Sequence, residues 1–253
     1  MLVVLVSAKG SPGVTTLAVA LAACWPGSGR PVLVECDPSG GSLAVRFGLG
    51  GDSGLVGLAA AARAGARRDA LRAWVRELPG GVRVVCAPVD AAQARAAVST
   101  LAGASASASA GDLRQRFGAE VVIADCGRAD PATEALVAAA DRVLVVVRPL
   151  ADDLAAVAVS AQRLRGLTRA VGVVLVGRGY PAGEVARELG LPVLGAVPRD
   201  EAAAAVLAGR LPRGRVSRRS GLVRAATELG RLLSGPSPTP VSDGRSLARA
   251  GRG

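Results

Sequence analysis

The residues of this sequence best suited to hold a phosphate group lie in one short loop near its start. Lys9 supplies an ammonium group, Gly10 and Gly13 let backbone N–H groups close around an anion, and Thr15 supplies a hydroxyl. The loop follows the apolar run Leu2 to Val6, which predicts a buried strand, and the pattern becomes helical at Thr15. Because a helix N-terminus presents positive charge, this order of strand, loop and helix predicts a phosphate site.

The composition of the chain sets Lys9 apart. Of the 31 basic residues, only Lys9 is a lysine, and all the others are arginines. A compact ammonium on a flexible stem suits contact with a phosphate, which favours a specific role for Lys9. The alternative is a surface lysine without such a role.

The loop differs from the ordinary phosphate-binding loop, G-x-x-x-x-G-K-[ST]. It resembles the deviant form K-G-G-x-G-K-[ST]-T of the MinD/ParA family of dimerising ATPases. Two positions depart from that form: Ser11 replaces the second glycine, and Val14 stands where the family has its second lysine. The chain is more similar to the CpaE/TadZ-like and actinobacterial MinD-like subgroup, which often lacks that lysine.

The resemblance implies binding of ATP with Mg²⁺ and a role for each loop residue. Lys9 is the signature lysine, which in the family acts across a dimer, and Thr15 is a Mg²⁺ ligand. The residues that would contact the nucleotide from this loop are Lys9, Gly10, Ser11, Pro12, Gly13, Val14, Thr15 and Thr16.

Two aspartates supply the carboxylates that such a site needs. Asp37 follows the predicted strand Pro31 to Cys36, in a segment that resembles the family's D-x-D-P-x-G with Glu35 in the first acidic place. Asp125 ends the apolar run Glu120 to Asp125, a Walker B pattern. We expect Thr15, Asp37 and Asp125 as metal ligands and Lys9 and Asp37 as catalytic residues. The alternative for Asp37 is a turn or helix-capping role.

The fold expected is α/β: a doubly wound, mainly parallel seven-stranded sheet with helices on both faces, as in P-loop NTPases. The strands are expected at 2–6, 31–36, 82–86, 120–125, 142–147, 171–176 and 193–197. Between the second and third strands the pattern predicts helices, the last of them from Arg67 to Leu78. Ligands of such sheets bind beyond the carboxyl ends of the strands, where the candidate residues should meet.

The expected nucleotide site also includes residues that would contact the adenine base. Arg178 matches the arginine of the family's Asn-Arg pair, although Gly177 takes the place of the asparagine that reads adenine. Pro198, Arg199 and Asp200 follow the seventh strand and resemble the loop that helps to enclose the base. We expect Arg178 to stack on or border the base, and these four residues complete the expected nucleotide site.

The resemblance covers residues 1 to about 233, which we expect to form one nucleotide-binding domain. The stretch 102–111 consists of Ala, Ser and Gly and predicts a flexible surface loop within it. The residues 234–253 are rich in Pro, Ser, Gly and Arg and predict a disordered tail.

The net charge of +11 favours polyanionic partners. A candidate contact for DNA phosphates is the cluster Arg210, Arg213, Arg215, Arg218 and Arg219, although a solvated arginine-rich segment explains it equally well. No apolar stretch reaches the roughly 18 residues of a membrane span, and the end of the chain does not resemble an amphipathic anchor. We therefore expect a cytoplasmic protein.

Two functions fit the sequence. The first is a MinD/ParA-like switch: ATP and Mg²⁺ join two subunits into a homodimer, which binds a protein partner or nonspecific DNA until slow hydrolysis releases it. Its cargo would be a chromosome or plasmid, a pilus or secretion machine, or a division site. The second is a scaffold of the same fold that binds partners without turnover, which Val14, Ser11 and Gly177 favour.

Overall fold

The structure is a computed structural model of the whole chain, and it describes residues 1–9, 12–27, 29–50, 54–66, 72–106, 121–209 and 219–235. Within these ranges the chain folds around one eight-stranded sheet, whose strands run in the order β3-β4-β2-β5-β1-β6-β7-β8. All neighbouring strands pair parallel except β3 and β4, which pair antiparallel. The strands are β1 (Leu2–Ser7), β2 (Val32–Glu35), β3 (Arg76–Leu78), β4 (Val82–Val85), β5 (Val122–Arg128), β6 (Arg142–Val147), β7 (Val171–Val176) and β8 (Val193–Val197).

The predicted α/β class and mainly parallel sheet are confirmed, with one strand more than expected. The additional strand, β3, lies at the edge of the sheet, where the sequence predicted the end of a helix from Arg67 to Leu78. The prediction of a helix is wrong for residues 76–78, and residues 67–71 lie outside the described part of the chain. The cause is the turn that follows, because Gly80 (φ 94°) and Gly81 (φ 84°) reverse the chain and pair β3 with β4.

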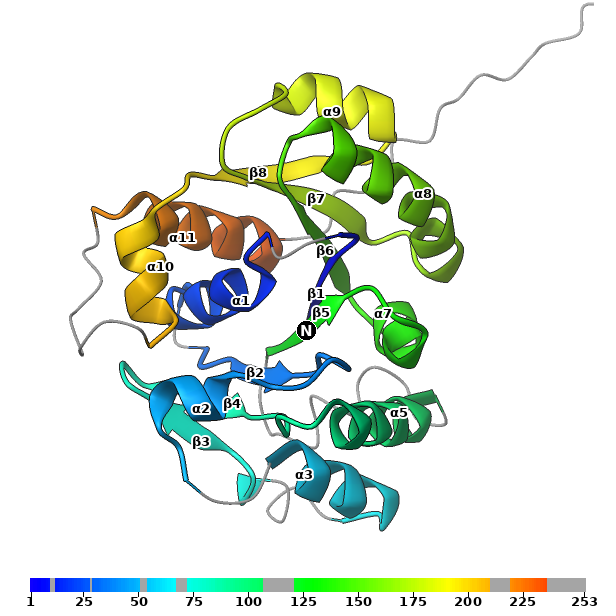
Figure 1. Cartoon of the computed structure of the whole chain (residues 1–253), viewed down its shortest axis with the longest axis vertical. Coiled ribbons are helices and arrows are strands. Elements are labelled where there is room, and N and C mark those ends of the chain that lie inside the picture. The colour runs from blue at the N-terminus through cyan, green and yellow to red at the C-terminus, as the bar shows by residue number, and fades with distance from the viewer. Residues whose placement is uncertain are drawn as a thin grey trace, which may run out of the picture.

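Helices cover both faces of the sheet, as the doubly wound fold requires (Figure 1). On one face lie α1 (Val14–Ala23), α2 (Leu43–Phe47), α10 (Glu201–Leu207) and α11 (Gly221–Ser234). On the other lie α3 (Gly54–Arg63), α5 (Ala91–Ala106), the short helix η1 (Pro131–Thr133), α7 (Glu134–Ala138), α8 (Ala151–Leu167) and α9 (Ala182–Leu189). None of the described helices has the length and apolarity needed to cross a membrane.

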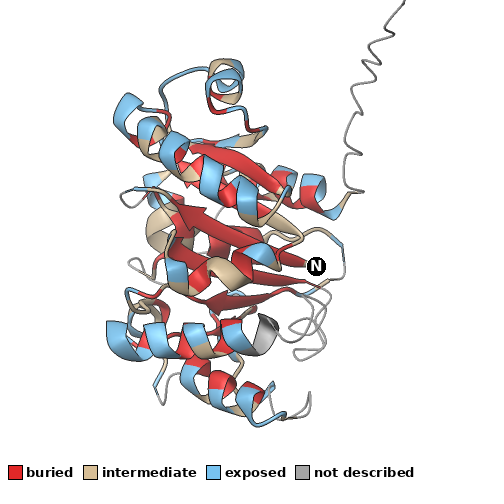
Figure 2. Ribbon diagram, turned by 90° about the vertical axis from the view of Figure 1, so that its right-hand side faces the viewer, coloured by how far each residue is buried: buried red, intermediate tan, exposed pale blue. Residues whose placement is uncertain are grey.

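Two aliphatic cores hold these layers together, one on each side of the strands (Figure 2). Alternate residues of β1 enter opposite cores: Leu2, Val4 and Val6 pack on the α3–α5–α7 side, whereas Val3 and Leu5 pack with α1 and α11. Every residue of β1 is buried, as expected for the central strand of a parallel sheet. The phosphate loop therefore leaves the middle of the sheet.

Helix α5 extends farther than the sequence predicted. It continues to Ala106, so 102–106 are helical rather than part of a flexible loop, and 107–111 lie outside the described residues. Alanine is the best helix former, and a helix that has already begun propagates through alanines at little cost. Helix α11 ends at Ser234, so the first residue of the tail expected at 234–253 is helical, and 236–253 lie outside the described residues.

Candidate nucleotide site

The loop after β1 opens into α1 as the sequence predicted. Gly13 adopts a left-handed conformation (φ 100°) at the N-cap of α1, and its carbonyl accepts the first helical hydrogen bond from the Leu17 N–H at 2.8 Å. Thr15 lies in the first turn of α1 and is half-buried, whereas Val14 is buried in the core. Pro12 and Thr16 flank this turn, and Gly10 and Ser11 lie outside the described residues. The N-terminus of α1 thus follows directly from the loop, which is the arrangement that binds phosphate.

Lys9 lies at the carboxyl edge of the sheet and is paired within the chain. Its Nζ donates to Oδ2 of Asp152, in the first turn of α8, at 3.1 Å. Both side chains are more than half exposed, at 53% and 63%, so the pair adds little to stability and can open. The partner could not be recognised from the sequence, because 143 residues separate the two side chains.

Asp125 is the most constrained of the candidate ligands. It lies within β5 rather than at its end and is fully buried, and its Oδ1 accepts from the Gly127 N–H at 3.2 Å. Burial raises the pKa of Asp125 to about 7, and the nearby charges of Glu35 and Asp37 act in the same direction. The Thr15 hydroxyl and the Gly127 N–H oppose this shift of the pKa. Oδ2 of Asp125 has no hydrogen-bond partner among the residues that the structure describes.

Asp37 reaches the same place from the turn after β2. Its Oδ1 accepts from the Ser39 N–H at 2.8 Å, and its Oδ2 lies so close to Gly127 that a Cβ there would collide with it. Gly127 itself is left-handed (φ 59°). Only glycine allows this approach, because a side chain at 127 would displace the Asp37 carboxylate.

Thr15, Asp37 and Asp125 therefore meet at the carboxyl edge, and together they fit Mg²⁺. They offer a hydroxyl and two carboxylates, the hard oxygen donors that Mg²⁺ prefers. The unpartnered Oδ2 and the raised pKa of Asp125 are what a carboxylate shows when its cation is missing. Within the described ranges, no three Asp, Glu, His or Cys side chains cluster as a metal site by themselves. Mg²⁺ commonly takes one or two carboxylates and completes its shell with phosphate and water.

Glu35, which the sequence placed beside Asp37, has a structural role. It is buried and in register with Asp125 on the neighbouring strand. Its Oε1 accepts from the N–H groups of Ser42 (2.6 Å) and Leu43 (3.1 Å), and its Oε2 accepts from the Ala87 N–H (3.0 Å). Burial raises the pKa of Glu35, and these N–H groups oppose the shift. Its carboxylate is saturated and holds the start of α2 against the loop after β4.

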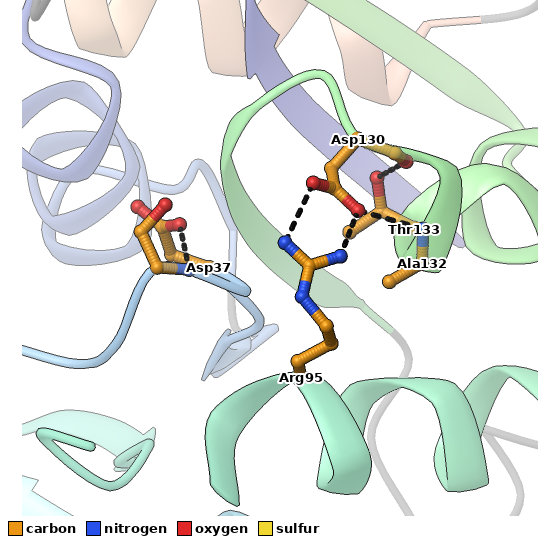
Figure 3. A network of polar contacts seen from close by, with 6 residues as sticks. Asp37, Arg95, Asp130, Ala132 and Thr133 are labelled. Atoms are coloured by element: carbon orange, nitrogen blue, oxygen red, sulfur yellow. Dashed lines mark hydrogen bonds and ion pairs between the residues drawn. The ribbon is translucent and has the colours of Figure 1, made fainter. Parts of the chain in front are cut away.

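A second polar network follows β5 and was not foreseen from the sequence. Arg95, in α5, forms a bidentate ion pair with Asp130, through Nη1 at 2.7 Å and Nη2 at 2.9 Å (Figure 3). Asp130 also accepts from the Ala132 N–H and caps η1, while the Thr133 hydroxyl donates to its carbonyl. The Arg95 guanidinium lowers the pKa of Asp130. The segment that carries Asp125 is thereby fastened to α5.

The residues expected near the base lie at the same edge. Arg178 follows β7 and is exposed. Pro198 and Arg199 follow β8, also exposed, and Arg199 is within 3.4 Å of Glu201. No hydrogen bond or ion pair between described residues joins them to Thr15, Asp37 or Asp125, so their place beside a base stays a prediction.

Asp200, expected beside the base, holds the starts of two helices. One oxygen accepts from the Ala203 N–H at 3.0 Å and caps α10, and the other accepts from the Ser220 hydroxyl at 2.6 Å. Ser220 in turn caps α11 through the Val223 N–H. The Ser220 hydroxyl and the Ala203 N–H lower the pKa of Asp200. Of the basic cluster that follows, 210–218 lie outside the described residues, and Arg219 is exposed and engaged in a contact.

These features define a class of protein: an α/β domain with a phosphate loop at the start of its first helix and a two-aspartate site on neighbouring strands. No protein-family model matches the sequence, and no curated protein matches it either.

Solved structures of that class share its fold. The cell division ATPase MinD of Pyrococcus furiosus superposes with a TM-score of 0.72 at 19% identity, over 92% of this chain and 97% of that one. A ParA-family ATPase of Chlorobium tepidum TLS superposes with a TM-score of 0.70 at 18% identity, over 91% of this chain and 98% of that one. MinD of Pyrococcus horikoshii OT3, solved with Mg-ADP, superposes with a TM-score of 0.71 at 17% identity, over 92% of this chain and 95% of that one. The chain has the fold of the MinD/ParA ATPases.

The close approach of Asp37 to Gly127 yields a first prediction. Gly127→Ala and Gly48→Ala both place an alanine in a left-handed conformation (φ 59° and 62°), which costs about 1–2 kcal/mol. Only Gly127→Ala also forces a Cβ against a carboxylate, because nothing lies within 4 Å of a Cβ at 48. Chemical unfolding should show the larger loss of stability for Gly127→Ala. Equal losses would mean that the contact with Asp37 contributes nothing.

The raised pKa of Asp125 yields a second prediction. Because the pKa rises from 3.8 to about 7 on folding, the contribution of this group to stability is present below about pH 4 and is lost as the pH rises through 7. This shift of the pKa corresponds to a difference of about 4 kcal/mol in the free energy of unfolding between pH values below 4 and pH values above 7. Asp125→Asn, without metal or nucleotide, should therefore be more stable than the wild type at pH 8 and should flatten its pH dependence.

Unfolding in denaturant at pH 5.5, 7 and 8.5 measures this difference, with Asp90→Asn, an exposed cap of α5, as the control. The assignment fails if the curves of wild type and Asp125→Asn stay parallel across this range.

The saturated carboxylate of Glu35 yields a third prediction. Glu35→Gln keeps the shape but turns an amide NH₂ toward a backbone N–H that now lacks an acceptor, which costs about 1–3 kcal/mol. Denaturant titrations should show this loss, whereas the exposed Glu188→Gln should change stability little. If Glu35→Gln is as stable as the wild type, the Glu35 carboxylate does not stabilise the start of α2.

Proposed function

We propose that this chain is a MinD/ParA-like nucleotide switch. It binds ATP with Mg²⁺, forms a homodimer around the nucleotide, and hydrolyses ATP slowly while it positions a cellular cargo in the cytoplasm. The observation that carries the proposal is the meeting of Thr15, Asp37 and Asp125 at the start of α1, with Oδ2 of Asp125 buried and unpartnered. The fold shared with MinD and ParA ATPases supports it.

Each residue of the site has a distinct task in this proposal. Thr15 and Asp125 would hold Mg²⁺, and Asp37 would hold its water shell or orient the attacking water. When bound, Mg²⁺ supplies positive charge to the phosphates. The α1 N-terminus binds the phosphate oxygens through its N–H groups. Solved relatives by fold include MinD with Mg-ADP and an ATP complex of a McdA variant from Cyanothece, which fits this choice of ligand.

The exposure of Lys9 is consistent with a role across a dimer. Its side chain is 53% exposed and, among the described residues, its one ion-pair partner is the exposed Asp152, so it can leave that partner without uncovering a buried group. A lysine that contacted its own phosphate loop would instead be directed inward. Lys9 would thus contact the nucleotide of the partner subunit.

The buried Val14 argues for slow turnover. In phosphoryl transfer the protein mainly positions groups and neutralises charge. A valine packed in the core at the first position of α1 cannot replace a lysine in that work. We therefore propose nucleotide binding with weak hydrolysis, and a cargo recognised through a protein partner or nonspecific DNA.

The same valine favours a second candidate, a scaffold of this fold that binds partners without turnover. The apolar packing of Val14 stabilises α1 at the position where the MinD/ParA family carries its second lysine. The two candidates differ in nucleotide binding and in its effect on mass.

Calorimetry with Mg-ATP, combined with light scattering, separates the two candidates. The switch predicts micromolar affinity and a doubling of mass with ATP, and Lys9→Ala should lose both, because it removes the trans contact. Arg187→Ala, another exposed residue in an ion pair, is the matched control and should behave as the wild type. Absence of binding at millimolar ATP, with unchanged mass, would reject the switch and leave the scaffold.

A further inference from the structure

A β-bulge lies between the phosphate loop and Asp125. Leu5 of β1 pairs with Asp125, but Ser7, two residues later, pairs with Arg128, three residues after Asp125. One residue of β1 is thus opposite two residues of β5, Cys126 and Gly127. Gly127 is left-handed (φ 59°), a conformation that glycine adopts without strain.

The bulge changes the face on which Arg128 lies. Side chains alternate along a strand, so without the extra residue Arg128 would lie on the face opposite Asp125. Paired with Ser7, it instead shares the face of Leu5 and Asp125. Leu5 packs with α1, so this is the face on which the phosphate loop begins its helix.

The backbone holds Arg128 in this place. The N–H of the next residue, Ala129, donates to the Ser7 carbonyl at 2.8 Å, and the Ser7 hydroxyl donates to the Gly127 carbonyl at 3.2 Å. Both bonds join the end of β5 to Ser7, the last residue of β1 before the phosphate loop. Arg128 is therefore fixed beside the phosphate loop, at the edge where the candidate ligands meet.

Arg128 also differs from most cations along this edge. Lys9 pairs with Asp152, Arg148 with Asp153 at 2.5 Å, and Arg199 with Glu201. The exposed Arg128 has no hydrogen bond or ion pair with a described residue. Arg178 shares that property but follows β7, two strands from β1 in the sheet. Among the described cations, Arg128 is the one beside the loop with no acid to neutralise it.

We propose that Arg128 contacts the terminal phosphate of the bound nucleoside triphosphate and supplies the positive charge that a lysine at position 14 would supply. This inference rests on the proposed nucleotide binding and adds a residue to it. A guanidinium can donate two parallel hydrogen bonds to phosphate oxygens, so it suits this contact even when it approaches from a neighbouring strand. The bulge at Gly127 is the device that presents it to the phosphate loop.

The test compares the affinities for ATP and ADP by calorimetry with Mg²⁺. Arg128→Ala should weaken ATP about tenfold or more, because a charge-assisted contact to the terminal phosphate is lost, while ADP changes less than about threefold. Arg128→Gln keeps the bulk of the side chain and should give the same selective loss, and Arg128→Lys should lie between it and the wild type. Adding Val14→Lys to Arg128→Ala should restore part of the ATP affinity.

Arg169→Ala is the matched control, because Arg169 is also exposed, makes no ion pair with a described residue and precedes β7 at the opposite edge. It removes the same charge and should leave both affinities unchanged. Equal losses for ATP and ADP in Arg128→Ala, or losses matched by Arg169→Ala, overturn the inference while the proposed nucleotide binding stands. A wild type that binds neither nucleotide overturns both.

Discussion

Two buried carboxylates lie in register on neighbouring strands at the centre of this structure, and the surrounding residues must compensate the cost of burying both. Glu35 on β2 and Asp125 on β5 lie side by side, and the charge of Glu35 helps to raise the pKa of Asp125. Burial of one carboxylate is costly, and burial of two together requires compensation for both. Glu35 has three backbone N–H donors, whereas Asp125 accepts from one N–H and lies near the Thr15 hydroxyl, and its Oδ2 has no partner among the described residues. The chain compensates the first carboxylate by itself, and the proposed function assigns the compensation of the second to a cation.

This division of roles also fixes the geometry around the site. Glu35 holds the end of the segment that starts at Asp37, since it binds the N–H groups of Ser42 and Leu43. At the other end, the Cys36 N–H donates to the Asp125 carbonyl at 2.7 Å. Asp37 therefore lies on a short chain that is anchored at both ends. It needs no further contact to remain against Gly127, so the two aspartates are positioned before any ligand binds.

The sequence predicted the parts of the site that follow from strand order. Asp37 and Asp125 end or nearly end apolar runs, and parallel strands bring such ends to one edge, so their meeting with Thr15 could be inferred from the sequence alone. The pairing of Lys9 with Asp152 could not, because it depends on how two loops 143 residues apart are packed. The strand β3 was missed since its residues fit a helical pattern until the glycine turn after it is considered.

Arg128 is the clearest case of information that only the paired strands contain. In the sequence it is one of many arginines, and a simple alternation from Asp125 places it on the wrong face. A bulge depends on both strands of a pair, and neither the residues of β1 nor those of β5 reveal it alone. The functional assignment of a residue near a strand end thus needs the register as well as the motif.

The balance between a switch and a scaffold depends on the same carboxylate. A scaffold that binds no nucleotide would gain stability from a neutral residue at 125, because the ionised Asp125 is buried and has an oxygen without a partner. Val14 shows that this chain can carry an apolar residue at a phosphate-loop position, yet Asp125, Asp37 and the close approach at Gly127 are all present. A site with its anionic ligands in place and its loop lysine absent keeps the oxygen donors that suit Mg²⁺. It is less suited to rapid cleavage, which favours a switch whose state is set by binding.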